Sequence, residues 1–175
     1  MNAPLAENWT IANQQLLVAE FARLKQRLRP AADLAAPGAQ AEPADNLRAA
    51  RQAGHSESAI DWLSAAFGLS AFERDLLLLC AGAEMDAELA RACALAQGDA
   101  TRPWVSFGLA LAVLESPHWS ALTPQRPLRH WRLLEVDANA GLAAGRLRID
   151  ERVLHFLVGI NELDASGEEV IHHIV

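Results

Sequence analysis

The fold is decided by the stretch Gly68-Leu69-Ser70-Ala71-Phe72-Glu73-Arg74-Asp75-Leu76-Leu77-Leu78-Leu79-Cys80-Ala81. Ser70 followed three residues later by Glu73 is a capping box, in which each side chain accepts the free backbone N–H of the other residue. Gly68 ends the helix that comes before it. Because the run from Leu76 to Cys80 is apolar on every side, a helix over 71–81 is predicted to lie in the middle of the core.

Further helices are predicted on both sides of this central helix. Ser56 caps a helix that runs to Phe67, and Asp86 caps another that runs to Gln97, because short polar side chains accept from the free N–H groups of a first turn. A fourth helix is predicted over 104–115, with an apolar stripe of Phe107, Leu111 and Leu114.

The pattern changes towards the C-terminus. Residues 127–136 mix Arg, Trp and branched side chains, and 146–149 alternate between charged and apolar residues. Residues 137–141 have turn chemistry. We therefore expect two antiparallel strands joined by a loop of about eight residues, followed by a helix that Asp150 caps. This order predicts a mainly α, winged-helix-like domain in which a two-stranded antiparallel hairpin is the wing.

A separate N-terminal helix is expected before that domain, over residues 1–29. Apolar residues at helical spacing form a narrow seam on one face of this helix. The seam can pack onto its own domain or form a coiled-coil-like contact with another chain. The predicted organisation is this helix, a Pro/Ala-rich linker over 30–54, the winged-helix-like domain over 55–160 and a tail over 161–175. The seam residues are Leu17, Phe21, Leu24 and Leu28.

The composition favours a globular protein of the cytoplasm that does not enter a membrane. The apolar share of 51% suffices for a core, and the formal net charge of −7 opposes non-specific binding to a phosphate backbone. Cys80 and Cys93 lie in apolar stretches and are expected to be buried thiols of a reducing compartment. The N-terminus lacks the pattern of a signal peptide.

No catalytic, cofactor-binding or metal-binding residues are predicted. The only lysine is Lys25, which is not part of a Gly-Lys-Ser/Thr sequence, so the P-loop motif is missing. Ser106 is not in a Gly-x-Ser-x-Gly turn, because Trp104 precedes it. The adjacent pair His172 and His173 does not have the spacing of a metal-binding pair on a helix.

Arginines gather in and beside the predicted hairpin, at positions 126, 129, 132, 146, 148 and 152. Three interpretations stay open: solvation of the strands, a docking face for an acidic protein, or a DNA-binding wing. The helix predicted over 104–115 has no Lys or Arg, which weighs against reading of a major groove. The candidate partner-binding residues are Arg129, Trp131, Arg132, Arg146 and Arg148.

Several of these segments resemble the N-terminal winged-helix domain of a family of bacterial AAA+ ATPases. The central stretch 68–81 resembles that family's GLSxFERDLLLLCA signature. The other similar segments follow in order: Asn13-Gln14 with 19–24, Thr101-Arg102-Pro103 with 106–111, 118–122, 127–133 and 147–157.

The resemblance implies a non-catalytic protein-interaction or regulatory domain, which presents partners or substrates to an ATPase module. In the family that module follows this region, so we expect the chain to be part of a longer protein. ATP and Mg are expected only for that module, and no ATP-binding residues are carried over to this chain. The implied partners are proteins and the chain's own AAA+ module, and the alternative is a DNA-binding winged helix that uses the Arg-rich wing.

Overall fold

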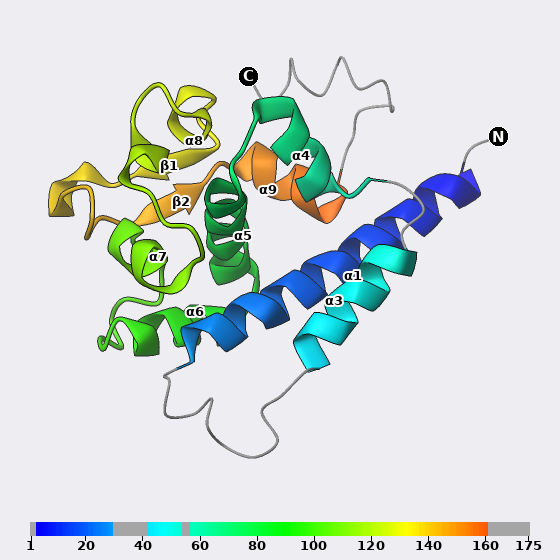
Figure 1. The fold of residues 1–175 in the computed structure, drawn as a ribbon, viewed down its shortest axis with the longest axis horizontal. Coiled ribbons are helices and arrows are strands. Elements are labelled where there is room, and N and C mark those ends of the chain that lie inside the picture. Colours follow the sequence, from blue (N-terminus) through cyan, green and yellow to red (C-terminus); the bar gives the residue numbers. More distant parts are fainter. Residues whose placement is uncertain (1–2, 30–41, 54–56, 161–175) are drawn as a thin grey trace.

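A computed structural model describes residues 3–29, 42–53 and 57–160 of the chain (Figure 1). It is mainly helical with a two-stranded antiparallel hairpin, which confirms the predicted fold class. The elements are α1 (Ala3–Leu28), α3 (Glu42–Ala53), α4 (Ala59–Phe67), α5 (Ala71–Met85), α6 (Ala87–Ala96), α7 (Phe107–Val113), η1 (Trp119–Leu122), α8 (Pro127–His130), β1 (Leu134–Val136), η2 (Ala138–Ala140), β2 (Leu147–Ile149) and α9 (Glu151–Val158).

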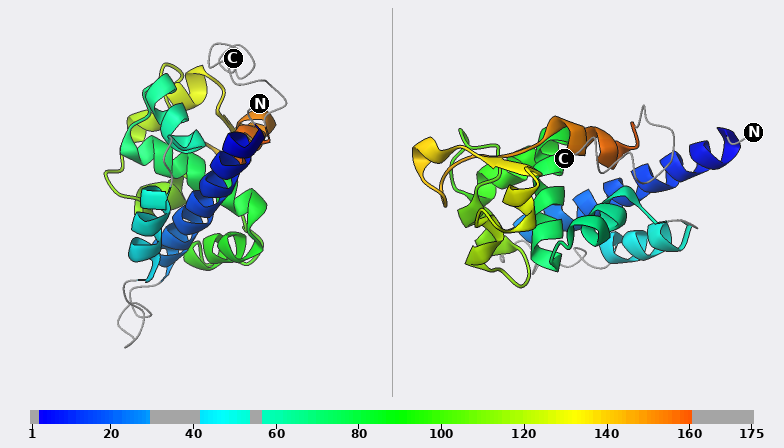
Figure 2. Two further views of the ribbon diagram at one scale, coloured as in Figure 1. Left: turned by 90° about the vertical axis from the view of Figure 1, so that its right-hand side faces the viewer. Right: turned by 90° about the horizontal axis from the view of Figure 1, so that it is seen from above.

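Helix α5 lies in the middle of the core, as its apolar run predicts (Figures 1 and 2). The side chains from Leu76 to Leu79 are all fully buried. Both halves of the capping box are present, since Ser70 Oγ accepts from the N–H of Glu73 and a Glu73 carboxylate oxygen accepts from the N–H of Ser70. The helix continues beyond the predicted end at Ala81 to Met85, and Asp86 then caps α6 as predicted.

Two helix boundaries differ from the sequence prediction. The N-cap of α4 is Ser58, whose hydroxyl accepts from the N–H of Asp61, whereas the predicted cap Ser56 lies outside the described residues. Helix α7 begins at Phe107 because Ser106 Oγ accepts from the N–H of Leu109, so the predicted helix over 104–115 is too long at its start.

The N-terminal helix α1 packs against its own domain. Its predicted seam from Leu17 to Leu28 is buried in the same core as α5. Helix α3 lies beside α1, so the predicted linker over 30–54 is wrong for residues 42–53 (Figure 1). Residues 30–41 and the predicted tail 161–175 lie outside the described residues.

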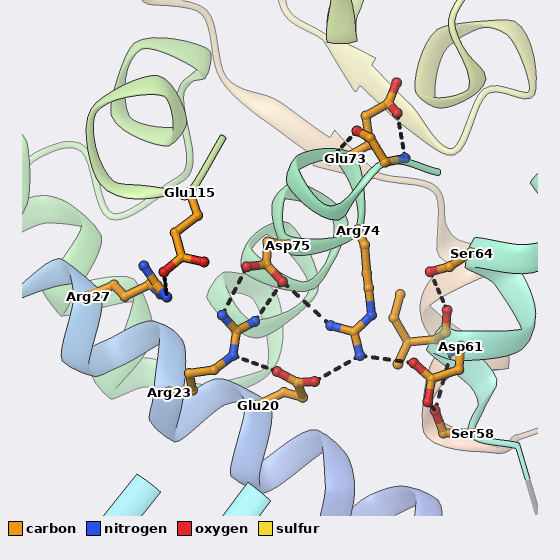
Figure 3. Close-up of polar contacts among 12 residues, drawn as sticks. Glu20, Arg23, Arg27, Ser58, Asp61, Ser64, Glu73, Arg74, Asp75 and Glu115 are labelled. Atoms are coloured by element: carbon orange, nitrogen blue, oxygen red, sulfur yellow. Dashed lines mark hydrogen bonds and ion pairs between the residues drawn. The ribbon is translucent and has the colours of Figure 1, made fainter. Parts of the chain in front are cut away.

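A cluster of ion pairs joins α1 to α3 and α5, and Figure 3 shows the contacts between α1 and α5. The carboxylate of Glu20 is fully buried and accepts from Arg23 at 2.8 Å, Arg74 at 2.8 Å and Arg51 at 3.2 Å. Arg23 also donates two hydrogen bonds to Asp75. The buried carboxylate of α1 is thus compensated by arginines of α1, α3 and α5.

The hairpin pairs β1 with β2 in the register Leu134–Ile149, Glu135–Arg148 and Val136–Leu147. The other edge of β2 is also paired with backbone. The N–H of Leu147 donates to the Val105 carbonyl at 2.9 Å, and Ser106 forms an isolated antiparallel β-bridge with Arg146. Leu134 and Leu147 are buried, and Glu135 and Arg148 face outwards. Within the described ranges, no helix is long and apolar enough to cross a bilayer.

Candidate functional site

The segment between α7 and β1 comes directly before the hairpin and contains η1 and α8. Residues 127–130 form helix α8 rather than the predicted strand, since Pro127 suits the first position of a helix. A helix with Arg129 and His130 therefore precedes the hairpin, whereas the helix predicted before it, over 104–115, has no Lys or Arg. It has only four residues and ends at His130 with Trp131 as its C-cap, and Arg132 then takes a left-handed backbone conformation with φ 54°.

Arg126 fastens this segment to the core. Its guanidinium donates to both carboxylate oxygens of Glu73, at 3.0 and 2.7 Å. Burial raises the pKa of Glu73, but the hydrogen bonds from Arg126 and Ser70 more than offset it and hold the pKa below its usual value. Arg126 is thus neutralised by an acid of the central helix.

Three further cationic residues near the hairpin also have structural partners. Arg146 pairs with Glu84 at 2.7 Å and lies over the Trp104 ring at 5.9 Å. Arg152 pairs with Asp150, the cap of α9, at 3.0 Å. Arg129 is half-buried and donates to the carbonyl of Leu122 at 3.3 Å.

Of the predicted partner-binding residues, Arg132 and Arg148 are the ones left exposed. Arg148 stands on the outer face of the hairpin opposite Glu135, and Arg132 stands at the entry to β1. Neither forms a salt bridge with a carboxylate in the part of the chain that the structure describes. Trp131 is half-buried and packs its ring against Phe67 at 5.6 Å. The five candidates therefore do not form one free cationic cluster.

The wing loop is pinned to the body and carries no charge at its tip. Residues 138–144 read Ala-Asn-Ala-Gly-Leu-Ala-Ala. The carbonyl of Ala143 accepts from Gly108 N–H at 2.8 Å, and that of Ala144 accepts from the Arg102 guanidinium at 2.8 Å. A loop held in this way, without Lys or Arg at its tip, lacks the groups that bind phosphates.

Gly145 is required by this close approach of backbone. A Cβ added there would lie 2.1 Å from the carbonyl oxygen of Asp137 and 2.7 Å from that of Gly141. We expect Gly145→Ala to lower the free energy of unfolding by about 1–3 kcal/mol, because the backbone of the loop must shift. Urea unfolding measures the effect, and Ala144→Ser at the exposed neighbouring position is the control. Equal urea midpoints for Gly145→Ala and Ala144→Ser would show that the loop does not require glycine at position 145.

Two exposed apolar residues near this segment were missed by the sequence analysis. The side chain of Trp119 on η1 is 60% exposed, and that of Leu142 at the wing tip is 40% exposed. In the sequence, Trp119 belongs to the segment 118–122 that resembles the AAA+ family, and nothing there predicted that its side chain is exposed. Exposure of an aromatic residue depends on what packs beside it, and no periodicity marks it in so short an element.

His118 joins two elements through hydroxyl groups. Its Nε2 lies 3.0 Å from Ser70 Oγ and its Nδ1 lies 3.0 Å from Ser120 Oγ. Ser70 Oγ also accepts from the N–H of Glu73 as the cap of α5. The contact therefore ties η1 to the start of the central helix.

The two cysteines are buried free thiols, as predicted. Burial raises the pKa of Cys93 to about 12 and raises the pKa of Cys80 well above its usual value, so both stay protonated near neutral pH. Among the described residues, no group of three His, Cys, Asp or Glu side chains could hold a metal ion. His172 and His173 lie outside the described residues.

A cavity of about 300 Å³ lies away from the hairpin, between α1, α3 and α4. Apolar side chains of Ala12, Leu16 and Ala50 line it together with polar groups of Arg51 and Asp61. Arg51 is paired with Glu20 and Asp61 with Arg74. The charges at this cavity thus already serve the contact between helices.

The comparisons with known proteins give one family. A family model described as "Winged helix domain, variant" matches residues 12–171, a span that starts within α1 and includes the whole hairpin. No curated protein and no solved structure matches the chain.

Proposed function

Since the chain belongs to the family "Winged helix domain, variant", we propose that it is a non-catalytic protein-interaction domain. It docks an acidic protein partner through the hairpin and the segment before it. The observation that carries this proposal is which arginines near the hairpin are exposed and which are paired with acids. Arg132 and Arg148 stay exposed, whereas Arg126, Arg146 and Arg152 are paired with acids of the chain.

The backbone at Arg132 supports a role for its side chain. A left-handed conformation costs about 1–2 kcal/mol for most residues other than glycine. Glycine would fit the turn from α8 into β1 without that cost. An arginine held there at φ 54° is best explained by a use for its exposed guanidinium.

DNA binding is the alternative, and a basic helix before the hairpin favours it. Arg129 and His130 lie on α8, and Arg132 follows it. However, α8 has four residues, Arg129 is tied to the Leu122 carbonyl, and the wing tip has no cation. Recognition of a major groove needs several side chains that reach base edges from one helix. Protein docking needs no such reach and is the better fit.

The first test removes the two exposed charges. In Arg132→Asn/Arg148→Gln, asparagine tolerates the left-handed backbone at 132. We expect retention of the acidic partner from an extract of the source cells, measured by quantitative mass spectrometry, to fall about two- to fivefold. Arg48→Gln/Arg91→Gln, which removes two exposed arginines on α3 and α6, is the control and should retain the partner normally.

Binding of a DNA duplex is measured on the same proteins. A steep fall of DNA affinity with salt, together with its loss in the Arg132→Asn/Arg148→Gln variant, would favour the alternative. Equal partner retention by the two double variants would contradict the docking proposal.

We also propose that the domain presents its partner to an AAA+ module of the same protein. The support is the resemblance to such N-terminal domains of residues 13–14, 19–24, 68–81, 101–103, 106–111, 118–122, 127–133 and 147–157. The test is the reading frame after Val175. A Gly-x-x-x-x-Gly-Lys-Thr/Ser sequence is expected there, and a frame that continues without one would refute this part of the proposal.

A further inference from the structure

Trp119 is an exposed aromatic side chain on a rigid support. The residue is 60% exposed, and its ring meets the ring of Phe107 edge-on at 5.3 Å. Phe107 is fully buried and packs in turn against Phe72 of α5. The indole is therefore held by the core on one side and is open to solvent on the other.

The short helix that carries Trp119 is fixed at several points. His118 bonds Ser70 and Ser120 and lies against the Phe72 ring at 5.2 Å. Thr123 closes the other end, because its hydroxyl donates to Ser120 O at 2.9 Å. A side chain ordered before binding loses little conformational entropy when a partner covers it. Tryptophans in such positions often dominate the energy of an interface.

The segment that carries Trp119 contains cationic residues and no acidic ones. Residues 116–134 contain no Asp or Glu, although the chain as a whole has a net charge of −7. Arg129 of α8 reaches the Leu122 carbonyl, one turn along η1 from Trp119, and Arg132, two residues after α8, is exposed. Arg126 contributes no free charge because Glu73 neutralises it.

We propose that Trp119 is the apolar anchor of the docking surface, and that the partner presents an acidic segment with an apolar side chain against the indole. This inference rests on the proposed function and names the chemistry of the partner. The exposed indole is the surface that the apolar side chain of the partner contacts. The acid-free segment around it accounts for the carboxylates, which meet the exposed Arg132. Stacking of nucleotide bases would use the same ring and is a separate outcome of the test.

The test uses the full chain and two glutamate-rich synthetic peptides, which differ only in whether their two central residues are leucine or serine. The readout is the indole N–H resonance of Trp119, identified among the five tryptophans by its loss in Trp119→Phe. We expect the leucine peptide to shift this resonance and the serine peptide to shift it far less. The indole of Trp9 donates to the Glu57 carbonyl and should stay in place as an internal reference.

Variants separate the anchor from the charges. Trp119→Ala should weaken binding of the leucine peptide about tenfold or more. Leu95→Ala is the matched control, because Leu95 is 78% exposed on α6, and should bind normally. Equal binding of the two peptides, tighter binding of oligothymidylate than of either, or no shift of the Trp119 resonance would overturn the proposal.

The two proposals fail in different ways. If Arg132→Asn/Arg148→Gln weakens peptide binding and Trp119→Ala does not, the anchor is refuted and acidic docking at the hairpin stands. If neither variant changes peptide binding, both are refuted.

Discussion

Replacing Glu20 with alanine should lower the free energy of unfolding by about 3 kcal/mol. The carboxylate is fully buried and accepts hydrogen bonds from Arg23, Arg51 and Arg74. Loss of one partner from a buried ion pair costs about 3–5 kcal/mol, because the remaining charge is left without compensation. Arg23 and Arg74 keep Asp75 and Asp61 (Figure 3), so we expect the lower end of that range.

Glu88→Ala is the matched control for Glu20. Glu88 is also paired with a cation, Lys25 at 3.0 Å, but its side chain is 73% exposed. An exposed ion pair contributes less than about 1 kcal/mol, since water screens both charges. Urea unfolding of the two variants measures the difference. Similar losses of stability would show that burial does not decide the strength of the Glu20 cluster.

The same carboxylate makes stability depend on pH. Burial raises the pKa of Glu20, but attraction and hydrogen bonds from Arg74 and Arg23 more than offset it, so the pKa lies below its usual value. Its contribution to stability is therefore complete above the usual pKa of a glutamate and is lost as the pH falls through the lowered pKa of the folded state. In Glu20→Gln the acid side of the pH–stability curve should be shallower.

Asn13→Leu should lower the free energy of unfolding by about 2–5 kcal/mol. Asn13 is 3% exposed. Its amide donates to the carbonyl of Leu157 at 2.7 Å, and its oxygen accepts the N–H of Ala59 at 2.9 Å. Leucine has a similar size but leaves both backbone groups buried without a partner, and each such group costs about 1–3 kcal/mol.

Gln14→Leu provides the comparison for Asn13. It changes an exposed amide on the next residue of α1, so its effect should stay within about 0.5 kcal/mol. Hydrogen exchange of the Ala59 amide gives a second readout, and it should become faster only in Asn13→Leu. Equal unfolding midpoints for the two variants would show that Asn13 does not hold α1 to α4 and α9.

Local rules predicted much of the fold and little of the site. The caps at Ser70, Asp86 and Asp150 are confirmed because a cap bonds N–H groups within three residues of itself. Helix α8 was mistaken for a strand because four residues make only about one turn, so the helical pattern does not repeat. The loop between the strands is longer than predicted and includes η2.

The candidate arginines show where sequence reasoning stops. Their grouping along the chain predicted one cationic surface, but the acids that neutralise Arg126 and Arg146 lie far away in sequence. Glu73 is 53 residues from Arg126, and Glu84 is 62 residues from Arg146. Packing of α5 against the hairpin decides which charges are neutralised.

The sequence by itself determined that this chain folds around an all-apolar helix, with capped helices on both sides and a hairpin near the C-terminal end. Those features depend on residues within a few positions of one another. The tertiary structure alone decided that α1 packs on its own domain and that Trp119 stays exposed. Asn13 meets partners 46 and 144 residues away, and burial at such separations depends on how the whole chain packs.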